Sequence, residues 1–226
     1  MYPLFPLDIW QFTYILVGML ATARSKLRRS ASLRDPERTR RKLLDAGFRE
    51  VYERGYQSAD LDAVLERAGV TKGALYYHFE NKEALGHAII EEVIAEMTRQ
   101  KWHIPLQKGN PIDTLIHIVQ STRTEVAEMR GGCPFNNLAQ EMSPLDEGFR
   151  KRLAKILSEW HGAMAGAFRR AQAEKMLRKD LDPDDEATFV IAMYEGYISL
   201  AKNSQDPKLL KSGKRRMIDY LESMRA

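Results

Sequence analysis

Hydrophobic residues recur three and four positions apart along almost the whole chain after Asp35, and no stretch alternates convincingly with a period of two. The first spacing puts apolar side chains on one face of a helix, whereas alternation is what a half-buried strand requires. Proline at helix starts and glycine beyond helix ends divide the pattern into segments. The pattern therefore predicts an all-α fold.

The same signals predict where the helices lie. Asp60 and Thr71 each precede a short apolar segment and are good N-cap residues for it. The last two predicted helices are joined by a tight turn and should pack antiparallel. The predicted helices are Pro36–Arg54, Leu61–Ala68, Lys72–Phe79, Lys82–Trp102, Ile112–Arg130, a short helix from Pro134 to about Ser143, Leu145–Arg178, Asp184–Ser204 and Pro207–Arg225.

Two of the short helices flank a glycine-containing turn, Ala68-Gly69-Val70-Thr71, which is the spacing of a helix-turn-helix. In that motif the second helix lies in the major groove of DNA. On the second helix Leu75 and Phe79 stand at i and i+4 and should face the core. The large residues left for the outer face are Tyr76, Tyr77 and His78. Their hydroxyl and imidazole groups can reach phosphates or base edges, although aromatic packing on a neighbouring helix is the alternative for each ring.

Charge is concentrated before and within this region. The net charge of the chain is +4, but the segment from Arg24 to Lys42 carries nine basic and two acidic residues. A basic arm of this kind is attracted to a polyanion such as nucleic acid or an anionic membrane surface, and a solvated tail without a partner is the alternative.

The segment before the basic arm is apolar. Ile9–Ala23 is shorter than the roughly 20 residues that a membrane-spanning helix needs, and Asp8 without any Lys or Arg before it argues against a signal peptide. Two interpretations remain. Translation could start at Met19, or the segment could form an amphipathic, membrane-associated helix. The single cysteine, Cys133, allows no intrachain disulfide, so we expect a cytoplasmic protein. Separately, because Ile9–Ala23 is too short to span a bilayer, we do not expect a membrane partner.

The run from Arg40 to Leu85, above all AGVTKGALYYHFENKEAL at its end, resembles the DNA-binding domain of the tetracycline-repressor (TetR) family of bacterial transcriptional regulators. The resemblance implies an N-terminal three-helix DNA-binding domain with a helix-turn-helix, followed by a larger helical ligand-binding and dimerisation domain. We accordingly expect an N-terminal extension and basic arm at 1–34, the DNA-binding domain at 35–82 and the second domain at 83–226.

The resemblance also assigns DNA-contacting positions. The residues on the recognition helix are Lys72, Gly73, Ala74, Tyr76, Tyr77 and His78, and Lys82 stands where the family commonly places a phosphate-contacting lysine. One departure is that Asp60 and Asp62 stand near the start of the second helix, where family members often carry Ser or Thr. Carboxylates repel phosphates, so contacts from this helix are in doubt.

A homodimer is the expected assembly. The predicted helix Asp184–Ser204 carries apolar residues around much of its circumference, more than one neighbouring helix can cover. An ordinary buried core helix is the alternative, but in the family two such helices pack against their twins as a four-helix bundle. The resemblance therefore implies a homodimeric repressor that binds a palindromic operator and is released by a small-molecule effector.

Residues for the effector are less specific in the sequence. Aromatic, polar and adaptable side chains on the later helices could line a cavity, although core packing explains each one alone. The candidates are His117, Phe135, Asn137, Trp160, Met164, Phe168, Met193 and Tyr197, with Trp102, His103 and Asn136 beside them.

Other classes of function have weaker support. The chain has no phosphate-cradling glycine loop, no metal-spaced cluster such as HExxH and no nucleophile elbow, so we expect no enzyme, catalytic residue, metal or cofactor. Cys133 falls near a helix start, with Arg130 close by, which would favour a reactive thiolate and an electrophile- or redox-sensing regulator. A helical ligand-binding adaptor without DNA binding is the third alternative, and its support is the pair Asp60 and Asp62.

Overall fold

The computed structural model describes residues 35–122 and 129–226. Within these ranges the chain is built of helices and turns, and extended backbone pairs at the isolated bridge between Leu177 and Arg225. The predicted all-α fold is confirmed. The apolar N-terminal segment and most of the basic arm lie outside the described residues. None of the helices in the described ranges is both long and apolar enough to cross a lipid bilayer.

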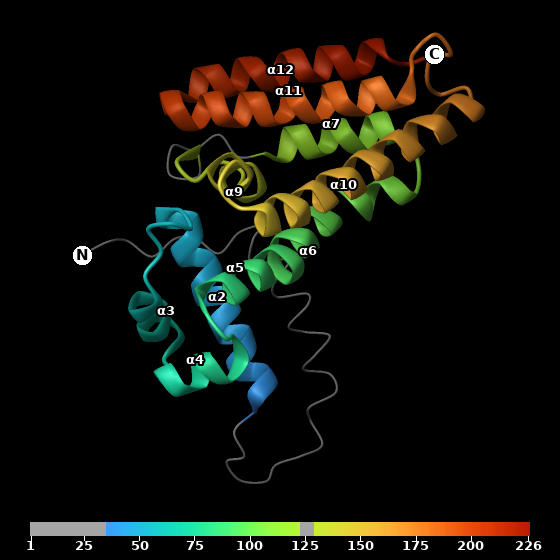
Figure 1. Cartoon of the computed structure of the whole chain (residues 1–226). Helices are drawn as coiled ribbons and strands as arrows, with labels where there is room; N and C mark the ends of the chain where they lie inside the picture. Colours follow the sequence, from blue (N-terminus) through green and yellow to red (C-terminus); the bar gives the residue numbers. More distant parts are fainter. Residues whose placement is uncertain (1–34, 123–128) are drawn as a thin grey trace, which may run out of the picture.

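Three helices, which we call the head, lie at one end of the molecule: α2 (Pro36–Arg54), α3 (Leu61–Ala68) and α4 (Lys72–His78) (Figure 1). The predicted caps form. Asp60 accepts a hydrogen bond from the N–H of residue 62 at 3.0 Å, and the Thr71 hydroxyl accepts one from residue 74 at 3.3 Å. These caps satisfy N–H groups that a helix start leaves free, so each start is fixed locally.

A continuous helical rod leads from the head into the rest of the chain. It consists of α5 (Lys82–Ala88), the π-helical η1 (Ile89–Ile94), α6 (Ala95–Thr98) and the π-helical η2 (Arg99–His103), and the 3₁₀ turn η3 (Pro105–Gln107) follows it. The extent agrees with the predicted helix. The two π-helical turns were not predicted, because they depend on which side chains the rod buries rather than on helix propensity.

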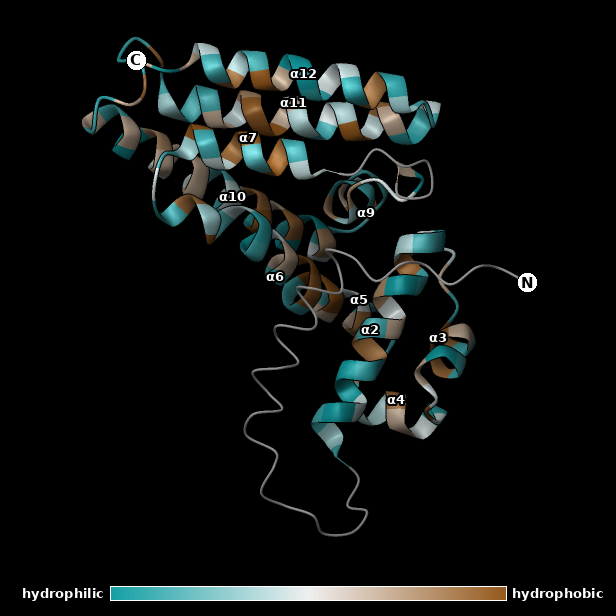
Figure 2. Ribbon diagram, turned by 180° about the vertical axis from the view of Figure 1, so that it is seen from behind, coloured by the Kyte–Doolittle hydropathy of each residue, from teal (hydrophilic) through white to brown (hydrophobic). Residues whose placement is uncertain are grey.

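The part of the chain that the structure describes contains five further helices, which we call the body. They are α7 (Pro111–Ser121), α9 (Pro134–Met142), α10 (Glu147–Ala173), α11 (Pro183–Ser204) and α12 (Pro207–Ser223). α11 and α12 run side by side at the end opposite the head, and α10 crosses beneath them (Figure 1). Hydrophobic residues lie along α6 and α10, where these helices meet the others (Figure 2).

The predicted helix Ile112–Arg130 is wrong at its C-terminal end, because α7 stops at Ser121 and Thr122 has an extended backbone. The hydroxyls of both residues donate to the carbonyl of Ile118, at 2.9 and 3.1 Å. Lys214 of α12 then donates to the carbonyl of Thr122 at 2.6 Å. Side-chain groups thus donate to backbone carbonyls that would accept backbone N–H groups if the helix continued, and this favours an end of α7 at Ser121.

The predicted helix Leu145–Arg178 is too long at both ends. Asp146 caps α10 by accepting from the N–H of Phe149 at 2.9 Å, so the helix begins at Glu147. At the other end Lys175 has a positive φ of 58°, and the N–H of Met176 donates back five residues at 2.8 Å. This backbone pattern terminates a helix, usually with glycine, and a lysine occupies the left-handed position here.

Candidate functional site

The recognition helix α4 has two chemically different faces. Leu75 and Phe79 are 2% and 3% exposed, and the Arg40 guanidinium lies 5.0 Å from the centre of the Phe79 ring. Tyr76 and Tyr77 are 47% and 76% exposed. The predicted facing of these four residues is confirmed. Among the described residues the outer faces of these two large aromatic rings are left uncovered, so they are available to a partner.

The other predicted DNA-contacting residues surround the two tyrosines. Lys72 and Gly73 are exposed, whereas Ala74 and His78 are half-buried. A Cβ added at Gly73 would meet no atom of the described residues within 4 Å, so nothing in this part of the chain covers the start of α4. The His78 ring packs edge-on against Tyr77, with ring centres 4.9 Å apart. The head therefore presents a slim helix end beside a tyrosine surface.

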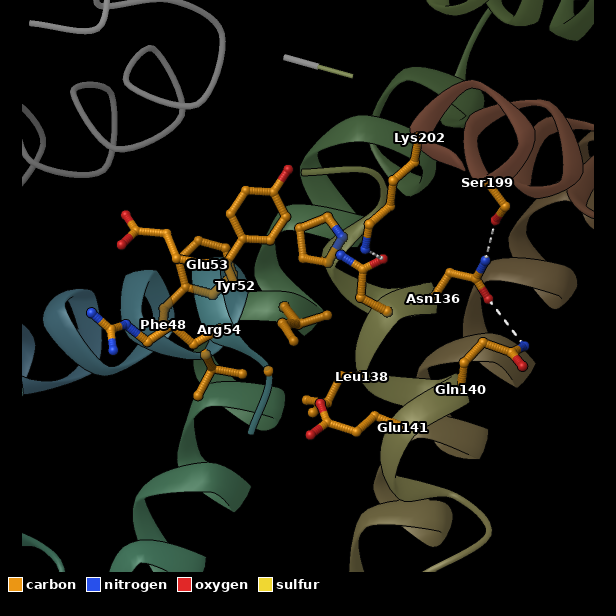
Figure 3. A pocket seen from close by; sticks show the side chains of 15 residues that line it. Phe48, Tyr52, Glu53, Arg54, Asn136, Leu138, Gln140, Glu141, Ser199 and Lys202 are labelled. Carbon is orange, nitrogen blue, oxygen red and sulfur yellow. Dashed lines mark hydrogen bonds between the residues drawn. The ribbon is translucent and has the colours of Figure 1, made fainter. Parts of the chain in front are cut away.

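A cleft of about 630 Å³ separates the head from the body. Figure 3 shows Phe48, Tyr52 and Arg54 of α2 on one side and residues of α9 and α11 on the other. Of the predicted effector residues, Asn137 lines this cleft, with its neighbour Asn136. Such a volume is typical of small-molecule sites, which commonly lie between domains.

Hydrogen bonds across this cleft tie the head to the body. The carboxylate of Glu141 on α9 accepts from the backbone N–H groups of Tyr56 and Gln57, both at 2.8 Å. The Tyr52 hydroxyl donates to the carbonyl of Gly132 at 3.0 Å. Gly55 lies between these contacts with a φ of 82°, and a Cβ there would come within 3.1 Å of the Glu141 carboxylate. The Glu141 carboxylate, the close approach at Gly55 and the Tyr52 hydroxyl therefore all contribute to the contact between head and body.

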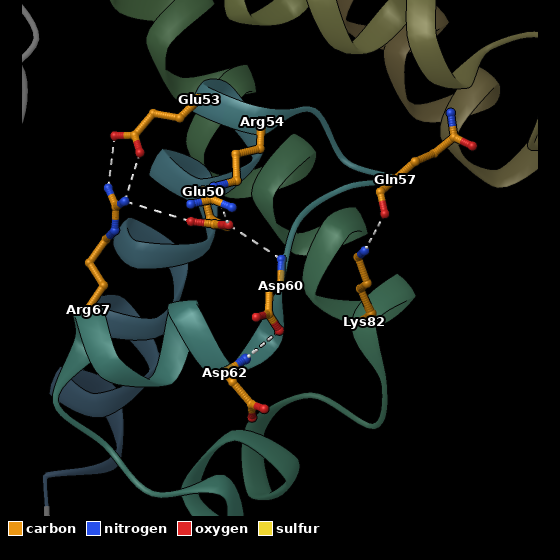
Figure 4. Close-up of polar contacts among 8 residues, drawn as sticks. All are labelled: Glu50, Glu53, Arg54, Gln57, Asp60, Asp62, Arg67 and Lys82. Carbon is orange, nitrogen blue, oxygen red and sulfur yellow. Dashed lines mark hydrogen bonds and ion pairs between the residues drawn. The ribbon is translucent and has the colours of Figure 1, made fainter.

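A charge network holds α2 against α3 and so positions α4 (Figure 4). Glu50 is 1% exposed and lies 3.3 Å from Arg54 and 3.7 Å from Arg67. Arg67 also makes a bidentate pair with Glu53, at 2.9 and 2.8 Å. Partners on both sides compensate the buried carboxylate of Glu50, so α3 is fixed relative to α2.

Asp60 and Asp62, whose carboxylates would repel DNA phosphates, differ in their contacts. Asp60 caps α3 with its side chain and donates its own N–H to Glu50 at 3.4 Å, whereas Asp62 is exposed. The ammonium group of Lys82 donates to the carbonyl of Gln57 at 3.0 Å and lies over the ring of Tyr56. Lys82 thus braces the turn between α2 and α3 and retains further N–H donors.

An aromatic cluster lies at the centre of the body. Trp102 of η2 contacts Trp160 of α10 and Tyr194 of α11, with ring centres 4.8 and 4.9 Å apart. Phe135 of α9 meets Trp160 edge-on at 6.2 Å. The predicted residues Phe135 and Trp160 are therefore brought together. The indole N–H of Trp160 is buried without a hydrogen-bond partner.

Beside this cluster lies a buried carboxylate that sequence reasoning missed. Glu195 of α11 is 9% exposed, and among the described residues its carboxylate oxygens have no N–H or O–H donor; the neighbouring group is the Cys133 thiol, a weak donor. Burial raises the pKa of Glu195 to about 6, against the opposing influence of Cys133 and Lys101. The ammonium group of Lys101 donates a hydrogen bond to the Tyr194 hydroxyl. Burial lowers the pKa of Lys101, but Tyr194, Cys133 and Glu195 raise it, and the pKa is raised on balance. A buried acid without a partner is costly and commonly marks a functional site.

The surroundings of Cys133 oppose the expected reactive thiolate, which stays a prediction. The residue does stand at the N-cap of α9, as expected. Burial, followed by the nearby charge of Glu195, raises the pKa of the Cys133 thiol well above its usual value, and the helix start and Lys101 offset this only in part. The thiol is therefore protonated near neutral pH, which makes it a poor nucleophile.

The remaining predicted effector residues do not gather in one place. His117 is exposed on α7, whereas Met164 and Phe168 of α10 are fully buried. Met193 is half-buried on α11, and the Tyr197 ring packs against Gly213 of α12, where a Cβ would lie 2.3 Å from it. His103 is half-buried and its Nε2 has no partner; burial lowers its pKa. The sequence offered no signal for Glu195 and Lys101, because their neighbours come from other helices.

Comparison with known proteins agrees with this architecture. Residues 43–89 match the family model described as bacterial regulatory proteins, tetR family. Residues 111–217 match the model described as tetracyclin repressor-like, C-terminal domain. The first match covers the helix-turn-helix, and the second covers most of the body.

Individual proteins give the same result. The chain is 35% identical over 173 residues to the transcriptional regulator AcuR of Cereibacter sphaeroides, covering 75% of this chain and 79% of that one. It is 29% identical to the HTH-type transcriptional repressor DhaR of a Mycobacterium species, covering 70% and 80%. A crystal structure of regulatory protein TetR from Rhodobacter sphaeroides superposes with a TM-score of 0.71 at 32% identity, covering 80% of this chain and 97% of that one. The chain therefore belongs to the TetR family of DNA-binding transcriptional regulators.

Proposed function

We propose that this chain is a cytoplasmic homodimeric repressor that binds a palindromic operator and is released by a small-molecule effector. The observation that carries the proposal is the pair of faces on α4, with Leu75 and Phe79 inward and Tyr76 and Tyr77 outward. Exposed tyrosines beside Lys72 suit phosphate and base-edge contacts in a major groove. The printed name of the Mycobacterium relative, a repressor, supports the direction of regulation.

The outer face of α11 supports the homodimer. Phe189, Met193, Gly196 and Leu200 recur at three- and four-residue intervals, which places them on one side of the helix. Phe189 and Leu200 are 49% and 54% exposed, and a side chain at Gly196 would meet nothing within 4 Å. An apolar stripe of this kind is typical of a surface that a second copy covers.

The centre of the body suits the effector. An effector with a hydrogen-bond donor beside an aromatic ring would satisfy Glu195 and stack within the cluster of Trp102, Trp160 and Tyr194. Binding there would act on Cys133 and the adjacent Gly132, whose carbonyl receives the Tyr52 hydroxyl of the head. The effector must bind the DNA-free arrangement more tightly than the DNA-bound one to release the operator.

The proposal is tested by selecting bound duplexes from a random DNA library. We expect an inverted repeat with half-sites about one DNA turn apart, roughly 34 to 36 Å, because a twofold protein reads a twofold site. An adaptor without DNA binding would enrich no sequence and show no salt-sensitive binding to random duplex DNA, and that result would refute the proposal.

A further inference from the structure

Three side chains from two separate parts of the chain meet where α5 packs against the start of α10. Glu83 and His87 stand one helical turn apart on α5, and Asp146 precedes α10. One ligand atom from each lies within 4.8 Å of the other two. Nε2 of His87 is 3.8 Å from the Glu83 carboxylate, which is too far for a hydrogen bond.

The imidazole nitrogen at this place lacks a partner. Nε2 of His87 is inaccessible to solvent and makes no hydrogen bond with any residue of the described ranges. Buried polar atoms are nearly always paired, so an unpaired nitrogen that faces two carboxylates requires an explanation.

Gly148 leaves space between two of these groups. A Cβ at Gly148 would lie 3.1 Å from Oδ1 of Asp146 and 3.1 Å from Nε2 of His87. Cε1 of His87 would lie 3.2 Å from this Cβ as well, so a side chain at residue 148 would press on two of the three groups. Arg152 is the cation nearby, and it is already engaged with Glu91 at 2.8 Å and the carbonyl of Gly148 at 3.0 Å.

We propose that Glu83, His87 and Asp146 bind a divalent first-row transition-metal ion of the Zn²⁺ type, which fastens α5 to the start of α10. One imidazole nitrogen and two carboxylate oxygens match this class, whereas Mg²⁺ and Ca²⁺ favour oxygen alone and Cu⁺ favours sulfur. Zn²⁺ bonds of about 2.0–2.2 Å require the donor atoms, which now lie within 4.8 Å of one another, to move closer together, and torsions of the exposed Glu83 side chain supply part of this movement. Water would complete the coordination.

The position of the site gives the ion a structural consequence. Asp146 accepts a hydrogen bond from the backbone N–H of Phe149. The Phe149 ring packs against the rings of His87 and of Tyr56 of the head, with ring centres 4.8 and 4.5 Å apart. An ion held between α5 and Asp146 would therefore stiffen the junction between head and body. This role is independent of the proposed effector and of the operator.

The test is a titration of chelator-treated full-length protein with Co²⁺, followed by its visible absorption, and with Zn²⁺ in competition. We expect the wild type to bind one ion per chain. Glu83→Gln and His87→Gln should each lower the affinity for the ion about tenfold or more. Gly148→Ala should do the same although it leaves all three ligands in place. The matched controls His117→Gln and Cys133→Ser should bind like the wild type. Zn²⁺ should also raise the thermal midpoint of the wild type and leave that of Glu83→Gln unchanged.

Contrary results are equally clear. Absence of saturable binding to the wild type, or the same affinity in Glu83→Gln and Gly148→Ala as in the wild type, overturns the proposal. Because Glu83 is exposed, its variant should fold even if His87→Gln does not.

Discussion

Glu195 is a carboxylate whose ionisation should cost the folded protein stability. Its pKa is raised from 4.5 to about 6 by burial, so the folded state holds its proton over a range in which the unfolded chain has lost it. The stability that this proton contributes is complete below the unfolded pKa and is lost as the pH rises through the folded value. A shift of this size corresponds to about 2 kcal/mol.

Replacing Glu195 with Gln removes this titration. The free energy of unfolding of Glu195→Gln relative to the wild type should therefore increase by about 2 kcal/mol between about pH 4 and about pH 7. Urea unfolding of both proteins across this range measures the difference. A difference that does not change with pH would mean that Glu195 is not held in its protonated form.

Cys133 should react slowly while Glu195 is present. The carboxylate helps to raise the thiol pKa, so Glu195→Gln should lower that pKa and accelerate alkylation by iodoacetamide at neutral pH. Mass spectrometry of the modified fraction with time measures the rate, and the exposed Glu174→Gln is the matched control. Fast alkylation of the wild type, with release of DNA, would restore the thiol-sensor alternative.

The environment of single residues was harder to predict than their position. The sequence placed Cys133 at a helix start, which is correct, because proline and glycine around it are local signals. Its acidity depends on Glu195 and Lys101, which lie on other helices, and burial outweighs the local helix start. The same holds for Asp146, which joins Glu83 and His87 only in the folded chain.

At the scale of the element, α4 should separate stability from recognition. Leu75→Ala and Phe79→Ala each remove a buried side chain and should destabilise the protein by about 2 to 5 kcal/mol. Tyr76→Ala is the exposed control on the same helix, and its effect should stay within about 0.5 kcal/mol. Chemical denaturation gives the three values. A tyrosine variant as destabilised as Leu75→Ala would contradict the assigned faces.

Helix starts were predicted better than helix ends. Asp35, Asp60 and Thr71 cap their helices through hydrogen bonds to N–H groups two or three residues ahead, so the sequence alone contains the signal. The end of α7 depends on Lys214, which reaches the carbonyl of Thr122 from α12. A donor so distant in sequence leaves no local pattern to read.

At the scale of the whole molecule, the apolar stripe of α11 should hold the dimer. Leu200→Glu introduces a charge on this stripe and should shift the protein towards monomer, because burying an unpaired charge is costly. Sedimentation equilibrium at micromolar concentration measures the assembly. Leu145→Glu, an even more exposed leucine before α10, is the matched control. Dimers that survive Leu200→Glu unchanged would exclude this face as the interface.

The sequence predicted the order of the DNA-binding domain and the second helical domain, but it did not predict how the head contacts the body. The helix-turn-helix spacing and the helical pattern that follows it agree with the two family matches. The domain limits at residues 34, 82 and 83 stay a prediction. The cleft between head and body depends on contacts such as Glu141 with the N–H groups of Tyr56 and Gln57, which no periodicity foretells.

The central claim is that the outer face of α4 reads DNA, and affinity for the library-selected duplex tests it most directly. Fluorescence anisotropy should show tight, steeply salt-dependent binding by the wild type. Tyr77→Ala and Lys72→Ala should bind at least about tenfold more weakly while unfolding at the wild-type denaturant concentration. Undiminished binding by both variants would contradict the account, because it would mean that DNA contacts a different surface.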